Sequence, residues 1–249
     1  MNKQAIAHAF GRAAKNYDNI ALFQQKSGQH LFNCLSIMPG KTVLDAGCGT
    51  GYFSEQWQLA GKHVIALDLS VSMLAIAQQK QAAMSYIQAD IEYLPLADKS
   101  IDLSFSHLAI QWCSNLAIPL SELYRITKKG GVVAFSTLID GSLQELEHCW
   151  QKVDNKRHIN SFMTFEQIKQ SCQAWRHSLE QQSWHLTYPS FASLLQSIKG
   201  IGATYITNGR QQRGLMTKNQ LFKLLDHYPH INAKFPLTYQ LVYGILYRE

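Results

Sequence analysis

Apolar side chains recur at spacings of three and four residues in two segments near the start of the chain. Residues 3–15 and 20–37 both show this period, which is typical of amphipathic helices. Pro39 and Gly40 follow the second segment and end it. The chain therefore begins with two predicted helices.

The helical period then gives way to short runs rich in β-branched and apolar residues. Five such runs, separated by helical stretches, cover residues 42–47, 62–68, 84–90, 100–106 and 131–137. Strands that alternate with helices predict parallel pairing through crossovers. We therefore expect a doubly wound, Rossmann-like α/β fold with a mostly parallel seven-stranded sheet.

The alternation lapses after Thr137. Two helical stretches, 142–155 and 164–176, come before the next strand-like run, 183–190. Helices near 191–199 and 217–227 then lead to a final strand, 237–248, which we expect to be antiparallel. A single domain with four parts follows: N-terminal helices (1–37), a ligand-binding half (38–139), a helical insertion (140–182) and the end of the sheet (183–249). The insertion is predicted to be a lid, or else a helical pair that only covers the sheet.

Composition narrows the class of protein. Of 249 residues, 46% are hydrophobic and 16% charged, which excludes a disordered chain. No apolar stretch approaches the roughly 20 residues that cross a bilayer, and no secretory signal is evident, so we expect a cytoplasmic protein that does not bind membranes. The five cysteines are scattered and never form a CxxC pair, so no metal site is expected.

The charge is unevenly distributed. The net charge is +6, and residues 181–225 contain no Asp or Glu. This stretch holds four basic residues that are candidates for contact with a partner: Lys199, Arg210, Arg213 and Lys218. An acidic partner is one explanation, and a merely solvated basic face is the other.

A glycine-rich turn follows the first predicted strand. Gly47, Gly49 and Gly51 lie where this strand leads into a helix, so the backbone can approach a ligand closely. Asp45 precedes the turn, and its charge would repel the pyrophosphate of a dinucleotide. S-adenosylmethionine has no phosphate and carries a sulfonium and an ammonium group, so an acidic residue here favours it.

Two further carboxylates follow the next strands. Asp68 ends the second run, where it can accept both hydroxyls of a ribose. Asp90 ends the third, where it can accept the exocyclic amine of adenine beside the apolar Ile91. Each Asp alone would pass for a helix cap. Three carboxylates at successive strand ends favour a nucleoside site.

These residues resemble the class I S-adenosylmethionine-dependent methyltransferases over roughly residues 39–137. The resemblance implies that the loop from Asp45 to Gly51 holds the methionine part, that Asp68 binds ribose and that Asp90 and Ile91 contact adenine. It also implies that residues 106–112 face the methyl group. The predicted donor-binding set is completed by Cys48, Leu69, Met73 and Ser106.

Other segments resemble one family within that class, the malonyl-carrier-protein O-methyltransferases of biotin synthesis. They are FGRAAKNYD (10–18), LAIQWC (108–113), ELYRITKKGG (122–131), FSTLIDGSLQEL (135–146), WQKVDNKRHINSF (150–162) and IKGIGAT (198–204). Two positions depart from the family pattern: His107 stands where Asn is common, and Ser161 where Arg is common. If that Arg holds the charge of the acceptor, another base must replace it here.

The resemblance implies methyl transfer to the free carboxylate of a malonyl thioester on acyl carrier protein. A carboxylic acid is already ionised at pH 7 and needs no general base, so catalysis must come from positioning and desolvation. Five residues are the catalytic candidates, namely Tyr17, Gln111, Trp112, His158 and Asn160. Tyr17 could align either the donor or the acceptor oxygen, Trp112 could exclude water, and the other three could hold the acceptor. In an extended segment the last two would point to one side.

The partner implied by the resemblance is acidic acyl carrier protein, for which the basic residues offer a docking surface. Nucleic acid is not expected, because no Lys/Arg-rich run is present. We expect a monomer. Three alternatives stay open: a methyltransferase of a small acid or quinone-type acceptor, a non-catalytic S-adenosylmethionine-binding regulator, and a dinucleotide-dependent oxidoreductase.

Overall fold

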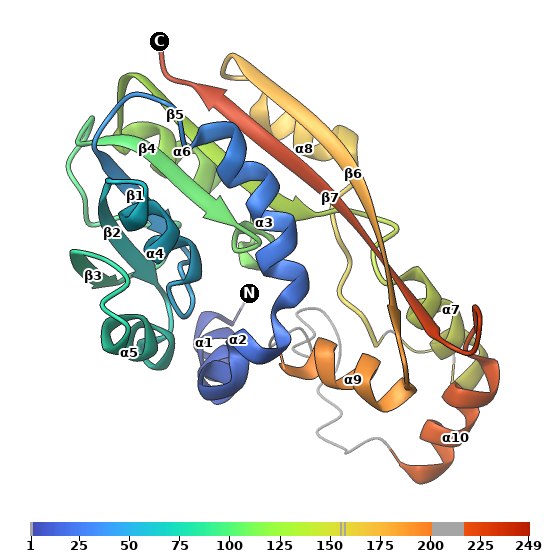
Figure 1. Ribbon diagram of the computed structural model, residues 1–249. Coiled ribbons are helices and arrows are strands. Elements are labelled where there is room, and N and C mark those ends of the chain that lie inside the picture. Colours follow the sequence, from blue (N-terminus) through green and yellow to red (C-terminus); the bar gives the residue numbers. More distant parts are fainter. Residues whose placement is uncertain (1, 155, 157, 201–216) are drawn as a thin grey trace.

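A seven-stranded sheet lies at the centre of the computed structural model (Figure 1). The structure describes residues 2–154, 156, 158–200 and 217–249, without the side chains of residues 199 and 200. The strand order is β3-β2-β1-β4-β5-β7-β6. The strands are β1 (Thr42–Ala46), β2 (His63–Asp68), β3 (Ser85–Gln88), β4 (Ile101–His107), β5 (Thr127–Leu138), β6 (His177–Tyr188) and β7 (Phe235–Tyr247).

The pairing of the strands confirms the predicted fold class. Strands β3, β2, β1, β4 and β5 pair in parallel, as β-α-β crossovers require. Strand β7 runs antiparallel to both β5 and β6, so the C-terminal strand is the one that reverses direction. The carboxyl ends of the parallel strands therefore meet at one edge of the sheet, where ligands bind in such folds.

Helices cover both faces of the sheet. Before β1 come α1 (Lys3–Ala13), α2 (Tyr17–Ile20) and α3 (Leu22–Leu35), with a 3-10 turn at Ala14–Asn16. The crossovers carry α4 (Tyr52–Leu59), α5 (Val71–Gln79) and α6 (Ala117–Ile126), and a 3-10 turn at Ile110–Trp112 follows β4. Apolar side chains form two buried clusters, one that includes Trp57 and Phe105 and a second that includes Leu44 and Phe135. No helix in the described part is long and apolar enough to cross a membrane.

The last two strands, β6 and β7, form a long antiparallel pair that extends beyond the rest of the sheet (Figure 1). Strand β6 begins at His177, six residues before the run in which the sequence predicted it. Apart from Glu180 and Gln181, which are both exposed, its residues alternate between half-buried and exposed, because it is an edge strand with one covered face. Polar residues such as Glu180 therefore belong to the strand and pair with β7.

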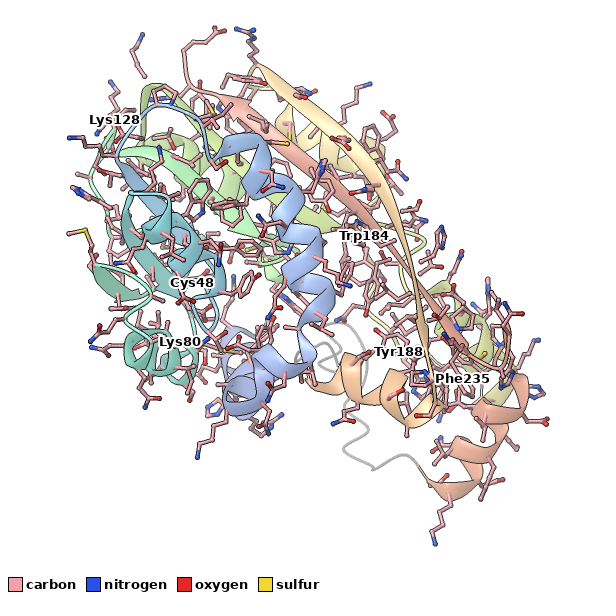
Figure 2. The ribbon with its side chains drawn as sticks, viewed as in Figure 1. Cys48, Lys80, Lys128, Trp184, Tyr188 and Phe235 are labelled. Carbon is pink, nitrogen blue, oxygen red and sulfur yellow. The ribbon has the colours of Figure 1, made fainter. Side chains whose placement is uncertain are left out.

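The remaining helices pack around these two strands. They are α7 (Gln144–Val153), α8 (Phe165–Cys172), α9 (Phe191–Gly200) and α10 (Lys218–His227). Helix α8 contacts α6 and β6 and so covers the sheet, whereas α7 contacts α10 and β7. Figure 2 marks Tyr188 and Phe235, where β6 ends and β7 begins, and Phe235 packs against Phe191 of α9. Helix α9 also contacts α2, which links this end to the N-terminal helices.

Candidate active site

A cavity opens at the carboxyl ends of β1, β2 and β4 and is covered by the N-terminal helices. We refer to this space as the donor cavity. Its lining includes all of the residues predicted to bind the donor except Gly51 and Ser106, and the catalytic candidate Tyr17 lines it as well. The predicted donor-binding residues that line it are Asp45, Gly47, Cys48, Gly49, Asp68, Leu69, Met73, Asp90 and Ile91.

The glycine turn after β1 needs its glycines for two different reasons. Gly47 has φ +81°, and a Cβ there would lie 2.3 Å from the Cβ of Ala109, so a side chain would be strained and would clash. Gly51 has φ +83° and does not line the donor cavity. A Cβ on Gly51 would lie 2.6 Å from that of Ala82, so this glycine permits close packing against the helix-to-strand connection behind the loop.

Asp45 and Asp68 are held by short hydrogen bonds. Asp45 is 2% exposed and accepts a hydrogen bond of 2.6 Å from the Ser54 hydroxyl on α4. Asp68 accepts backbone N–H groups from Gly49 at 2.9 Å and from Ser70 at 2.8 Å. Its carboxylate thus connects the glycine turn to the start of α5. Figure 2 marks Cys48 on the same turn.

Burial raises the pKa of both carboxyl groups. The pKa of Asp45 rises to about 7, chiefly through burial and further through the charge of Asp68, although the Ser54 hydrogen bond lowers it. Burial also raises the pKa of Asp68, against the lowering effect of its backbone donors. An anionic cavity of this kind favours a cationic ligand, because a positive charge relieves the repulsion between the two carboxylates.

Asp90 lies at the other end of the donor cavity. Its Oδ1 accepts a hydrogen bond from the ammonium of Lys3 at 3.0 Å, and the same ammonium pairs with Glu92 at 2.7 Å. Ile91 is buried beside it. Helix α1 thus reaches the part of the cavity that the sequence assigned to adenine.

The N-terminal segment is fixed to the glycine turn at a second point. Asp18, on α2, accepts a hydrogen bond from the Thr50 hydroxyl and pairs with Lys80, which is labelled in Figure 2. Lys80 also donates to the Thr50 carbonyl at 3.1 Å. Burial and the nearby charges of Asp68 and Asp18 raise the pKa of Tyr17, so its hydroxyl keeps its proton.

Strand β4 presents a different residue to the cavity from the one predicted. Ser106 is fully buried and does not line the donor cavity, whereas the next residue, His107, does. Successive side chains of a strand point to opposite faces, which explains the difference. His107 Nε2 lies 2.8 Å from the Gln24 carbonyl, and its Nδ1 lies 2.6 Å from the Ser136 hydroxyl. Burial lowers the pKa of His107 to about 4, so the ring is neutral at pH 7.

A second, smaller cavity adjoins the donor cavity; we call it the acceptor cavity. Four of the five nominated residues line it, namely Tyr17, Gln111, Trp112 and Asn160, and of these Tyr17 and Trp112 also line the donor cavity. Gln111 Nε2 donates to the Leu108 carbonyl at 2.7 Å. The remaining lining is mainly apolar and comes from several elements: Phe10, Phe23, Leu108, Leu138, Leu143, Ile159, Phe162, Ile198 and Tyr239, with the amide of Gln24.

His158 is not brought to the acceptor cavity with Asn160. Its ring stacks on Trp150 with 3.5 Å between ring centroids, and its Nε2 lies 2.9 Å from Asp154. The indole and the carboxylate hold the imidazole against α7, so these contacts do not support a joint grip of His158 and Asn160 on the acceptor. Gln24, in contrast, borders the donor cavity although the sequence did not nominate it. His107 does so as a member of the segment 106–112, within which it was not singled out as a site residue.

The predicted docking residues are only partly described. Lys218 is the first residue of α10 and is exposed. Lys199 lies in α9, but its side chain is outside the described residues, as are Arg210 and Arg213 entirely. The base expected in place of the family Arg is not found, since no Lys, Arg or His of the described residues lines the acceptor cavity.

The residues present fit S-adenosylmethionine: a glycine cradle, an anionic wall around Asp45 and Asp68, and an apolar end at Ile91. A family model described as a methyltransferase domain matches residues 44–135. Solved structures with the same fold include the YcgJ protein of Bacillus subtilis (TM-score 0.59, 16% identity, 89% of this chain and 99% of that one). Another is phosphoethanolamine N-methyltransferase 2 of Haemonchus contortus with S-adenosylhomocysteine (TM-score 0.56, 20% identity, 90% of this chain and 53% of that one). Fold and cavity together define a class I S-adenosylmethionine-dependent methyltransferase.

Curated relatives narrow this class. The chain is 50% identical over 249 residues to malonyl-acyl-carrier-protein O-methyltransferase of Serratia marcescens, covering 100% of this chain and 97% of that one. It is 47% identical over 249 residues to the protein of that name from Yersinia pestis, covering 100% and 93%. The chain belongs to the malonyl-acyl-carrier-protein O-methyltransferase family.

Proposed function

We propose that this protein transfers the methyl group of S-adenosylmethionine to the free carboxylate of a malonyl thioester on acyl carrier protein. The observation that carries the proposal is the identity of 50% to the Serratia marcescens protein over the full chain, insertion included. Two adjoining cavities, one anionic and one mainly apolar, support it. The product, a methyl ester, hides the charge of the malonyl group, and we assign this step to biotin synthesis.

The donor cavity offers a partner for each part of the donor. Gly47, Cys48 and Gly49 would hold the methionine part beside Asp45, and Asp68 would accept the ribose hydroxyls. Asp90 would accept the exocyclic amine, with Ile91, Leu69 and Met73 as apolar walls. When bound, the donor supplies an electrophilic methyl group on a sulfonium, which leaves as a neutral thioether.

The acceptor needs no proton transfer. A malonyl carboxylate has a pKa near 4, so it is ionised at pH 7 and its own electron pair forms the new O–C bond. The role of the protein is to align that oxygen and to remove its water, which increases its attraction to a cation. Trp112 and Phe10 meet edge to face, 5.4 Å apart, and help to enclose the place where the cavities meet.

The same proposal covers the partner. Acyl carrier proteins are acidic, and we assign Lys199, Arg210, Arg213 and Lys218 to their docking surface. The absence of acidic residues between 181 and 225 supports this assignment. We also propose that the enzyme is monomeric and cytoplasmic and that it uses no metal in catalysis. Neither a nucleic acid nor a membrane is proposed as a partner.

An acceptor panel tests the function. Purified protein is incubated with methyl-labelled donor and, separately, with malonyl-carrier protein, malonyl-coenzyme A, free malonate or a quinol. We expect the highest kcat/KM with malonyl-carrier protein, and negligible labelling of free malonate and quinol. Preferred labelling of either small acceptor would replace the proposed function with a small-molecule methyltransferase. Tight binding of S-adenosylhomocysteine without turnover of any acceptor would favour a regulator.

A further inference from the structure

The donor and acceptor cavities share a short boundary. Five residues line both cavities: Phe10, Tyr17, Gln24, Leu108 and Trp112. An acceptor oxygen that reaches the donor cavity from the acceptor cavity passes through this boundary. The polar ends available there are the Tyr17 hydroxyl, the Gln24 carboxamide and the Trp112 indole N–H.

Gln24 has a hydrogen-bond acceptor that no described residue uses. Its Oε1 is enclosed and has no hydrogen-bond partner among the described residues. A buried polar atom without a partner destabilises a fold, so its retention at a cavity boundary points to a ligand. The amide oxygen and nitrogen exchange places by rotation of the last side-chain bond, so the amide can offer N–H groups to an anion.

The backbone of Gln24 is bonded to His107 of β4, and this ring is held in turn by β5. His107, at the end of β4, bonds to the Gln24 carbonyl through Nε2 at 2.8 Å. The Nδ1 atom of the same ring bonds to the Ser136 hydroxyl of β5 at 2.6 Å. Since the carbonyl can only accept, Nε2 carries the hydrogen and Nδ1 accepts from Ser136. The amide therefore extends from a helix residue that is anchored to the sheet.

Neutral donors suit this reaction better than a cation. A Lys or Arg paired with the acceptor carboxylate would lower the energy of its electron pairs and weaken its attraction to the sulfonium. Amide, phenol and indole N–H or O–H groups orient a carboxylate without cancelling its charge. The described lining of the acceptor cavity holds Gln24, Gln111 and Asn160 as its amides and no basic side chain.

We propose that Gln24 binds the acceptor carboxylate, its amide N–H donating to the carboxylate oxygen that does not react. The inference rests on the proposed function and adds a residue to the acceptor site. Gln24 would then act with Tyr17 and Trp112 as a neutral clamp at the boundary of the two cavities.

The test compares the wild type with Gln24→Leu and with a control on the same helix, Gln29→Leu. Gln29 is half-buried, donates to Asn33 and lines neither cavity. We expect Gln24→Leu to lower kcat/KM for malonyl-carrier protein at least tenfold and to leave the Kd for S-adenosylhomocysteine within twofold. Its melting temperature should stay equal or rise, because an unpaired buried polar atom is removed. Gln29→Leu should keep wild-type kcat/KM.

If the wild type methylates malonyl-carrier protein, the proposed function stands, and any one of three results would then overturn the inference about Gln24 alone. They are unchanged kcat/KM in Gln24→Leu, a tenfold weaker Kd for S-adenosylhomocysteine, and a melting temperature lowered enough to account for the lost activity. Binding of malonyl-pantetheine to the S-adenosylhomocysteine complex, measured by calorimetry, provides a readout besides turnover. A wild type that neither binds nor methylates the malonyl thioester would overturn the function and the inference together.

Discussion

At the scale of single residues, the donor cavity buries an acidic group whose ionisation is unfavourable without a ligand. Asp45 is buried beside Asp68, and its pKa is raised to about 7. A cationic ligand favours the ionised carboxylate, so binding and deprotonation of Asp45 are linked. Donor binding should therefore depend on pH near neutrality.

S-adenosylhomocysteine carries an ammonium group, which is the positive charge that favours ionised Asp45. We therefore expect its Kd to decrease as pH rises from 6 to 8. Above pH 7 Asp45 is ionised before the ligand arrives, whereas below pH 7 its proton must first be lost. Asp45→Asn should bind at least tenfold more weakly at pH 8 and lose this pH dependence. Calorimetric titrations at three pH values measure both; an Asn variant with the wild-type pH profile would contradict the assignment.

His107 gives a second pH effect, on stability. Its pKa is about 4 in the folded protein against 6.5 for a free side chain, so the unfolded state binds more protons between these values. Its contribution to stability is therefore present above about pH 6.5 and is lost as pH falls toward 4. The difference in unfolding free energy between wild type and His107→Asn should shrink over this window in urea titrations. A constant difference would show that the ring does not titrate as described.

The residues also show what the sequence could predict about the site. Asp45, Asp68 and Asp90 were found because each lies at or close to the carboxyl end of a strand, and these ends meet at one edge of a parallel sheet. His107 was passed over in favour of Ser106, since a shift of one residue along a strand reverses the face. Gln24 has no motif, and only the packing of α3 brings it to the cavities.

At the scale of elements, the N-terminal helices are attached to the donor site by charged contacts. Helix α2 contributes Asp18, which bonds to Thr50 and Lys80, and α1 contributes Lys3, which pairs with Asp90 and Glu92. These contacts cross from the two N-terminal helices to the loops after β1 and β3 and to the end of α5. They hold a cover over the donor cavity.

We expect Asp18→Asn to accelerate dissociation of S-adenosylhomocysteine about fivefold, because the weakened contact lets the cover open more often. Asn19→Ala, at the exposed neighbouring position, is the matched control and should dissociate at the wild-type rate. Stopped-flow tryptophan fluorescence is suitable, since Trp112 lines the cavity. Equal rates in both variants would show that the contact does not hold the cover.

Strand β6 is the element that the sequence predicted least accurately. Its first half, with Glu180, Gln181 and Gln182, lacks the apolar alternation of a half-buried strand. It is a strand because β7 offers a continuous partner from Phe235 to Leu246. Pairing over long distance in the chain leaves no local signal, whereas the buried parallel strands such as β1 and β4 are evident from their apolar composition.

At the scale of the whole molecule, the donor cavity and the stretch assigned to carrier docking carry opposite charges. The donor cavity is anionic, whereas in the stretch 181–225 the Lys and Arg residues are not balanced by any Asp or Glu. Electrostatic docking of an acidic carrier weakens as salt screens it, whereas a small thioester lacks that surface. We expect KM for malonyl-carrier protein to rise at least threefold from about 50 to about 300 mM salt, and KM for malonyl-pantetheine to change little.

Charge reversal at one described residue localises the effect. Lys218→Glu on α10 should raise KM for the carrier substrate severalfold and leave KM for malonyl-pantetheine unchanged. Lys169→Glu is the control, because Lys169 is also exposed but lies on α8, outside the acid-free stretch. Steady-state kinetics at low salt measure both, and equal effects of the two substitutions would point to net charge rather than a docking surface.

The central claim is that the methyl group reaches a carboxylate oxygen of carrier-bound malonate. The most direct measurement uses a donor with a deuterated methyl group, malonyl-carrier protein and intact-protein mass spectrometry before and after treatment with a carboxyl esterase. We predict one added labelled methyl group, which hydrolysis of the ester removes as labelled methanol. A label that survives hydrolysis on the malonyl carbon, or a carrier that gains no mass, would contradict this claim.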